Sequence, residues 1–85
     1  MPKVVMYSTE LCPYCRMAER LLLARGVATI EKVCVDRDSE RLFEMIAKTG
    51  RRTVPQVFVG GHHVGGFDDL LALDRRGKLD ALLEV

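Results

Sequence analysis

The sequence predicts an α/β protein with a four-stranded mixed sheet, its elements in the order β-α-β-α-β-β-α. A short apolar run at residues 4–7, a helical pattern and then a β-branched run predict a βαβ unit, whose strands a right-handed crossover would place in parallel. Two further short runs flank Gly60-Gly61 and predict an antiparallel hairpin. Leucines at helical spacing after residue 68 predict a closing helix.

Local signals bound the first helix and the strand after it. The helix is expected from Pro13 to about Arg25, because Gly26 supplies a left-handed C-cap after an apolar stripe of Met17, Ala18, Leu21, Leu22 and Ala24. The second strand is expected within residues 27–36, where several residues favour extended structure, namely Ile30, Val33, Cys34 and Val35.

The second helix is expected to begin at Asp38 or Ser39 and to end at Gly50, with an apolar face of Leu42, Phe43, Ile46 and Ala47. The hairpin strands are expected at residues 56–59 and 62–64, directly after a proline that need not donate to the sheet.

The closing helix is expected to open at Asp68-Asp69 and to end at Gly77. A last apolar helical face follows it, formed by Leu79, Leu82 and Leu83.

The composition is that of a globular protein. A chain of 85 residues, 48% hydrophobic and 29% charged, predicts one domain over residues 1–85 with a single core. The net charge of +1, with basic residues scattered among twelve acids, argues against nucleic-acid and membrane partners. We expect a cytoplasmic protein, because there is no signal-peptide pattern or apolar segment of about 20 residues and the three cysteines are an odd number. We also expect a monomer.

Cys12-Pro13-Tyr14-Cys15 is the segment most indicative of chemistry. It begins the first helix, so Cys12 falls at the N-cap, where free amides and the helix dipole favour a thiolate over a thiol whose ordinary pKa is about 8.5. Cys15 lies one turn on, roughly 5–6 Å away, close enough for a disulfide. The pattern predicts a redox pair in which Cys12 is the nucleophile and Cys15 the resolving thiol.

Two other interpretations of the pair are less favoured. A structural disulfide would close a loop of about four residues, which stabilises a fold little. A zinc site would need two more ligands, but Cys34 is the only other cysteine and His62-His63 are adjacent rather than spaced. We therefore predict no metal, and we expect both histidines to be solvated surface residues.

The motifs Cys12-Pro13-Tyr14-Cys15, Thr53-Val54-Pro55 and Gly65-Gly66 with Asp68-Asp69 follow one another in the order and spacing of the glutaredoxins. The chain resembles the small bacterial dithiol members of that family over essentially all of its length. The resemblance implies the thioredoxin fold, a cis Pro55, and glutathione as co-substrate with no tightly bound cofactor.

The resemblance also implies which residues bind glutathione. Val54 would pair its backbone with the cysteinyl residue of the peptide, and Gly66 would allow close approach. The start of the last helix, from Phe67 to Asp69, would bind the γ-glutamyl carboxylate through backbone amides, and Asp69 or Asp68 would pair with the ammonium. Of the two, we expect Asp68 to be the N-cap of the helix and Asp69 to face the ligand. The full expected set is Tyr14, Arg51, Arg52, Thr53, Val54, Pro55, Gly66, Phe67, Asp68 and Asp69.

The chain departs from the family pattern at two positions. Thr9 stands where many members carry a lysine, so Arg51 and Arg52 would have to meet the glycyl carboxylate. Phe67 stands where a cysteine is common, so only its backbone role carries over. We expect Cys34 to be a small buried residue of the sheet rather than a second reactive or glutathionylated thiol.

The expected function is glutathione-dependent reduction of glutathionylated proteins and of protein disulfides. One alternative is an electron donor recharged by thioredoxin reductase, which should lack the Gly-Gly-x-Asp-Asp segment present here. The other is a glutathione-ligated iron–sulfur carrier using Cys12 from two subunits, against which Pro13 and Tyr14 argue, since cluster-binding members usually have a small residue after the first cysteine.

Overall fold

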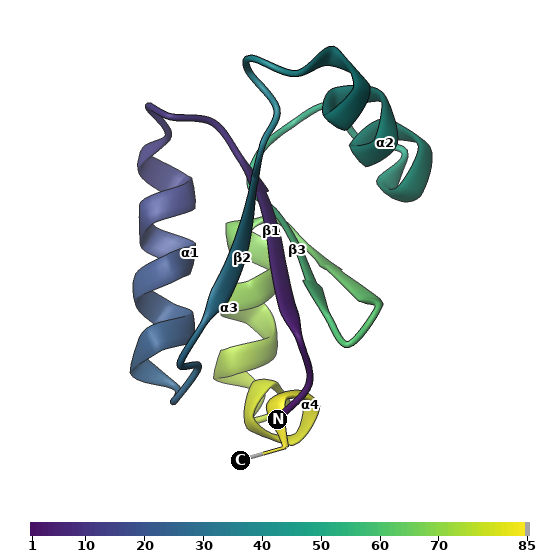
Figure 1. The fold of residues 1–85 in the computed structure, drawn as a ribbon. Coiled ribbons are helices and arrows are strands. Elements are labelled where there is room, and N and C mark those ends of the chain that lie inside the picture. Colours follow the sequence, from purple (N-terminus) through teal and green to yellow (C-terminus); the bar gives the residue numbers. More distant parts are fainter. Residues whose placement is uncertain (85) are drawn as a thin grey trace.

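The computed structural model describes residues 1–84, and its elements follow the predicted order (Figure 1). The strands are β1 (Val4–Ser8), β2 (Ile30–Cys34), β3 (Gln56–Val59) and β4 (His62–Gly65). The helices are α1 (Pro13–Ala24), α2 (Ser39–Thr49), α3 (Phe67–Arg75) and α4 (Leu79–Leu83).

The sheet has the strand order β2-β1-β3-β4. β1 is parallel to β2 and antiparallel to β3, which in turn is antiparallel to β4, so the predicted mixed sheet is confirmed. A register shift between Val57 and Phe58 interrupts the pairing of β3 with β4.

The two faces of the sheet are covered unequally. α1 and α3 lie against one face, and their N-termini point to the same end of the sheet, the end at which β1 stops (Figure 1). The core on this side draws on α1, α3, α4 and the central strands, through residues such as Val4, Met6, Ala18, Leu22 and Leu70. α2 alone covers the other face, where Met45 packs with Tyr7 and Val35.

The expected apolar faces of the first two helices need correction. In α1 the buried residues are Cys15, Ala18 and Leu22, whereas Met17 is 42% exposed. In α2 the fully buried residue is Met45, and Phe43 is 65% exposed. The reason is that only a narrow stripe of each helix meets the sheet, and its position depends on how the helix docks rather than on the apolar pattern alone.

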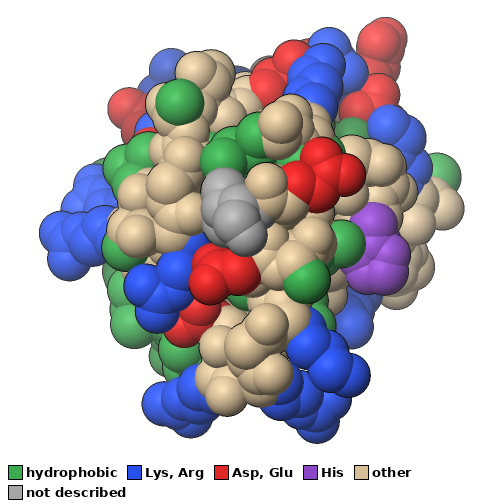
Figure 2. Space-filling view, turned by 90° about the horizontal axis from the view of Figure 1, so that it is seen from below, with side chains coloured by type: hydrophobic (Ala, Val, Ile, Leu, Met, Phe, Trp, Pro, Cys, Tyr) green, Lys and Arg blue, Asp and Glu red, His purple; other side chains and the backbone are tan. Residues whose placement is uncertain are grey.

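The surface carries both signs of charge. On the face shown in Figure 2, Lys and Arg side chains are interspersed with Asp and Glu and do not form a continuous basic stripe. Among residues 1–84, no helix has the length and apolar character needed to cross a bilayer.

Candidate active site

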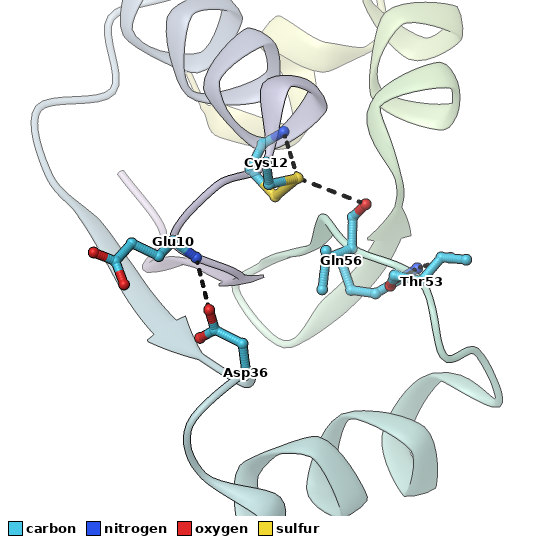
Figure 3. The surroundings of a disulfide bond; sticks show 7 residues. Glu10, Cys12, Asp36, Thr53 and Gln56 are labelled. Carbon is cyan, nitrogen blue, oxygen red and sulfur yellow. Dashed lines mark hydrogen bonds between the residues drawn. A yellow bond between two sulfur atoms is a disulfide. The ribbon is translucent and has the colours of Figure 1, made fainter.

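The start of α1 holds the two cysteines of the motif. Cys12 is the N-cap, with extended backbone angles, and Pro13 opens the helix, as predicted. The backbone N–H of Cys15 donates to Cys12 Sγ over 3.2 Å, and the two residues form a disulfide with their Cα atoms 5.2 Å apart (Figure 3). Cys12 is 8% exposed and Cys15 is 4% exposed, so solvent reaches the pair only over a small area.

The segment before β3 lies beside Cys12. The Val54–Pro55 peptide bond is cis, as the resemblance implied. The Val54 carbonyl oxygen is 4.0 Å from Cys12 Sγ, so backbone from a segment far along the chain lines the approach to the sulfur.

A groove of about 230 Å³ extends from Val54 to the start of α3. It collects every residue expected at the glutathione site except Arg52, and it adds Gln56: its lining is Tyr14, Arg51, Thr53, Val54, Pro55, Gln56, Gly66, Phe67, Asp68 and Asp69. The rings of Tyr14 and Phe67 approach with centroids 6.3 Å apart and so form an aromatic edge of the groove. Arg52 is exposed and does not line it.

Asp69 has two partners at this groove. Its Oδ2 accepts from the backbone N–H of Gly66 over 2.9 Å and from Arg51 Nη1 over 2.8 Å. The Arg51 hydrogen bond, followed by the Gly66 amide, holds the pKa of the Asp69 carboxyl below its ordinary value. The N-cap of α3 is Gly66, so Asp69 is the third helical residue and its carboxylate reaches back to the cap.

This arrangement corrects the expected division between the two aspartates. Asp68 was the expected N-cap, but α3 begins at Phe67, and Asp69 does the capping. Asp68 is exposed and, within residues 1–84, makes no side-chain hydrogen bond or ion pair. The carboxylate that is free to meet a ligand is therefore that of Asp68.

Gly65 makes room for this cap. Its φ of +116° lies in the region that favours glycine, and a Cβ there would collide with the Asp69 carboxylate. At Gly66 a Cβ would be 3.5 Å from the Pro55 carbonyl, which is an ordinary contact. Gly65 is thus the residue of the pair that the local packing requires to be glycine.

Residues 4–64 match the family model for glutaredoxin. The chain belongs to the glutaredoxin family. The glutaredoxin of Pseudomonas aeruginosa is 53% identical over 85 residues, which covers all of both chains. Glutaredoxin 3 of Escherichia coli K12 is 46% identical over 84 residues, 99% of this chain and 100% of its own.

Solved glutaredoxins share the fold. The dithiolic glutaredoxin of Trypanosoma brucei brucei superposes with a TM-score of 0.85 at 42% identity, over 96% of this chain and 87% of its own. A buckwheat glutaredoxin–glutathione complex superposes with a TM-score of 0.87 at 34% identity, over 98% of this chain and 77% of its own. This chain accordingly has the thioredoxin-like fold of glutaredoxins, and the family supports a thiol–disulfide oxidoreductase role.

In this glutaredoxin a second groove, of about 420 Å³, opens on the other side of the disulfide. Both redox cysteines line it, together with Met6, Ser8, Thr9, Glu10, Arg16, Glu19, Lys32, Cys34 and Arg37. In Figure 3, Glu10 and Asp36 lie on one side of Cys12, and Thr53 and Gln56 lie on the other. Thr9 therefore lies in the groove away from Arg51, so it does not share a wall with the predicted carboxylate site.

Cys34 is exposed rather than buried, which corrects the expectation from its strand. It ends β2, and its thiol donates to Asp36. That hydrogen bond to a carboxylate is the main cause that raises the pKa of the Cys34 thiol, so the thiol form is favoured over the thiolate.

A polar contact beside the groove, between Gln56 and His63, was not foreseen from the sequence. Gln56 is fully buried, and His63 is half-buried instead of solvated, with its Nε2 2.8 Å from Gln56 Oε1. Burial is the first cause that lowers the pKa of His63, followed by the charge of Arg51. Among residues 1–84, no group of three or more His, Cys, Asp or Glu residues is placed to hold a metal ion.

Proposed function

We propose that this chain is a glutathione-dependent oxidoreductase that reduces protein–glutathione mixed disulfides and protein disulfides. The observation that carries the proposal is that the 230 Å³ groove meets the nucleophile at Val54, whose carbonyl lies 4.0 Å from Cys12 Sγ. A tripeptide that pairs with the Val54 backbone would present its own sulfur to Cys12. The similarity to a glutaredoxin whose structure is a glutathione complex supports the same ligand here.

The charges at one end of the groove suit the γ-glutamyl group. The first N–H groups of a helix have no partner within the helix, and those of Phe67 and Asp68 are available for the carboxylate. Asp69 is already engaged, which leaves the Asp68 carboxylate to pair with the ammonium.

We assign the glycyl carboxylate to Arg51. Arg51 lines the groove and uses Nη1 for Asp69, so its other donors can form a charge-assisted pair with a carboxylate. Arg52, outside the groove, would contribute only attraction at longer range.

The chemistry begins with a thiolate at Cys12. It attacks the glutathione sulfur of a mixed disulfide; the Cys12–glutathione bond forms, the protein sulfur leaves as a thiolate, and that thiolate then takes a proton. A second glutathione thiolate attacks the bound glutathione sulfur, releasing oxidised glutathione and restoring Cys12. The N-cap position stabilises the Cys12 thiolate, which is the form that attacks in the first step and leaves in the second.

Protein disulfides require the second cysteine. Cys12 attacks one sulfur and forms a mixed disulfide with the protein, and Cys15 then attacks Cys12 Sγ, so that the protein leaves with both of its sulfurs reduced. The product on this chain is the Cys12–Cys15 disulfide, which two glutathione molecules reduce. We place this cycle in a reducing compartment such as the cytoplasm, where an exposed free thiol like Cys34 persists, and on a monomer.

The decisive experiment is a coupled assay with glutathione, glutathione reductase and NADPH. We expect the wild type to reduce both a glutathione mixed disulfide of β-mercaptoethanol and a protein disulfide. Cys12→Ser should abolish both activities, because no other residue supplies the nucleophile. Cys15→Ser should keep the first activity and lose most of the second, because only the second needs a resolving thiol.

Cys34→Ser is the matched control, since it removes the third thiol and should leave both rates near those of the wild type. A wild type that thioredoxin reductase and NADPH recharge, but glutathione does not, would contradict the proposal. So would a Cys15→Ser variant as inactive as Cys12→Ser toward the mixed disulfide.

A further inference from the structure

A buried amide connects β4 to the rim of the groove. Gln56 is the first residue of β3 and has no exposed surface. Its Nε2 donates to the Thr53 carbonyl over 3.0 Å and to Thr53 Oγ1 over 3.3 Å, while its Oε1 lies 2.8 Å from His63 Nε2 (the Gln56–Thr53 side is drawn in Figure 3). Every polar atom of this side chain therefore has a partner, as burial demands.

The partners fix the direction of the hydrogen bonds. A carbonyl oxygen only accepts, so the amide nitrogen of Gln56 must face Thr53 and its oxygen must face His63. His63 Nε2 consequently carries a proton and donates. The donors then run in one direction, from His63 on β4 through Gln56 on β3 to Thr53.

The strands explain why these residues meet. Gln56 and Phe58 are two apart in β3 and share a face of the sheet, and Phe58 pairs with His63 across the hairpin. The rings of Phe58 and His63 lie 5.0 Å apart, which holds the imidazole over the strand. His63 is thus placed by two contacts, one apolar and one polar.

We propose that His63 is a positioning residue: through Gln56 it fixes the orientation of Thr53 and Val54, and so governs how well glutathione binds rather than how reactive Cys12 is. The inference rests on the glutathione site proposed above. Thr53 and Val54 both line that groove, but His63 does not, so its effect must pass through Gln56. Val54 is the residue whose carbonyl lies 4.0 Å from Cys12 Sγ, so its orientation bears directly on where a bound peptide would put its sulfur.

The charged groups around His63 act on its protonation but not on this bond. Arg51, Asp69 and His62 are the neighbours whose charges it feels. The Nε2 proton is present both in the imidazolium and in the neutral tautomer protonated at Nε2, so His63 donates to Gln56 in both states. The positioning effect should consequently be similar at pH 6 and at pH 8.

The test compares His63→Phe, which keeps the ring packing and removes the donor, with His63→Gln, which restores an N–H donor. We expect His63→Phe to raise the KM for the glutathione mixed disulfide roughly two- to tenfold, the size produced by losing one hydrogen bond. The kcat and the rate of Cys12 alkylation by iodoacetamide should change little, and His63→Gln should recover most of the KM.

A second variant keeps the test decisive if His63→Phe folds poorly. Gln56→Met breaks the same connection, and the double variant should raise KM no more than the larger of the two single changes, because both act through one path. Additive effects on KM would overturn the inference, and so would a His63→Phe variant with the KM of the wild type.

A measurement without ligand separates this inference from the proposed function. In the amide NMR spectrum of the free protein, His63→Phe should shift the Thr53 and Val54 signals and leave that of Glu84 in place. Unchanged Thr53 and Val54 signals would overturn the positioning role. A wild type that does not use glutathione would overturn the proposed function instead, whatever these signals do.

Discussion

The Asp69 carboxylate both stabilises the start of α3 and holds a charged residue of the groove in place. One oxygen of its carboxylate accepts from both the Gly66 amide and Arg51, so the side chain that caps the helix also positions Arg51 at the groove. Asp68, the neighbouring residue, has the same chemistry but points its carboxylate to solvent. Helical geometry sends the two adjacent side chains in different directions, so Asp69 has the structural role and Asp68 has the ligand-facing role in the site that we propose.

This division predicts opposite phenotypes for two alanine substitutions. Asp69→Ala removes the cap contact, which typically costs about 1 kcal/mol, and should lower the Tm of the ligand-free protein by roughly 4–8 °C. Asp68→Ala should change that Tm little but raise the KM for glutathione, because the ammonium loses its partner. Thermal melts without glutathione, set beside steady-state KM values, make the comparison. The roles are wrong if Asp68→Ala melts lower than Asp69→Ala.

α2 is the helix with the least support from other helices. It is alone on its face of the sheet, and its fully buried side chain is Met45, packed with Tyr7 and Val35. The hydroxyl of Tyr7 donates to Glu44 over 2.5 Å, which ties the helix to β1. Burial and this bond to a carboxylate raise the pKa of Tyr7, so the hydroxyl stays protonated and keeps donating through the physiological range.

Met45→Ala should therefore be costly and Phe43→Ala should not. Truncating a fully buried methionine typically costs about 2–5 kcal/mol, whereas Phe43 is 65% exposed and its truncation should stay within about 0.5 kcal/mol. Urea unfolding of the two variants at pH 7 measures the difference. Equal losses, or a larger loss for Phe43→Ala, would mean that α2 docks through the face that its sequence pattern favoured.

These cases indicate what the sequence could predict. The ends of α1 and α2 were predictable because Gly26 and Gly50 adopt positive φ, a local requirement that the residue type itself reveals. The redox pair and the cis Pro55 were predictable because their motifs are local or match the family. Met45 was missed because which stripe of a helix is buried depends on docking against distant strands.

Most of the site could be predicted from the sequence as well. Nearly all of its lining residues were predicted, since the three motifs contain them. The roles of Asp68 and Asp69 were exchanged because the N-cap is Gly66, two residues before the expected cap at Asp68. The Gln56–His63 contact depends on the interrupted register of β3 and β4, and nothing local in the sequence encodes that register.

Ionisable groups connect elements that are distant in the sequence. Arg25, at the end of α1, makes two hydrogen bonds to Asp74 in α3, of 2.5 and 2.8 Å. This contact with Arg25 is the main cause that lowers the pKa of Asp74. The pKa of His63 is lowered as well, first by burial. Both groups therefore bind protons more weakly in the folded protein than in the unfolded chain.

As the pH falls, each of these groups takes up its proton in the unfolded chain before it does so in the folded protein. The free energy of unfolding should therefore fall in two pH ranges, one for His63 and one for Asp74. The His63 contribution is complete above its unfolded pKa of about 6.5 and is lost as the pH drops below that value toward the lower folded pKa. The Asp74 contribution is complete above its unfolded pKa of about 3.9 and is lost as the pH drops below that value.

Urea unfolding of the wild type from pH 8 to pH 3 should show both losses. His63→Gln should flatten the upper range only, and Asp74→Asn should reduce the lower loss only. Glu84→Gln, a change at an exposed carboxylate, serves as the control and should leave the Asp74 step in place. A wild-type stability that is constant from pH 7 to pH 5 would contradict the His63 assignment, and an Asp74→Asn profile parallel to the wild type below pH 4 would contradict the Arg25–Asp74 one.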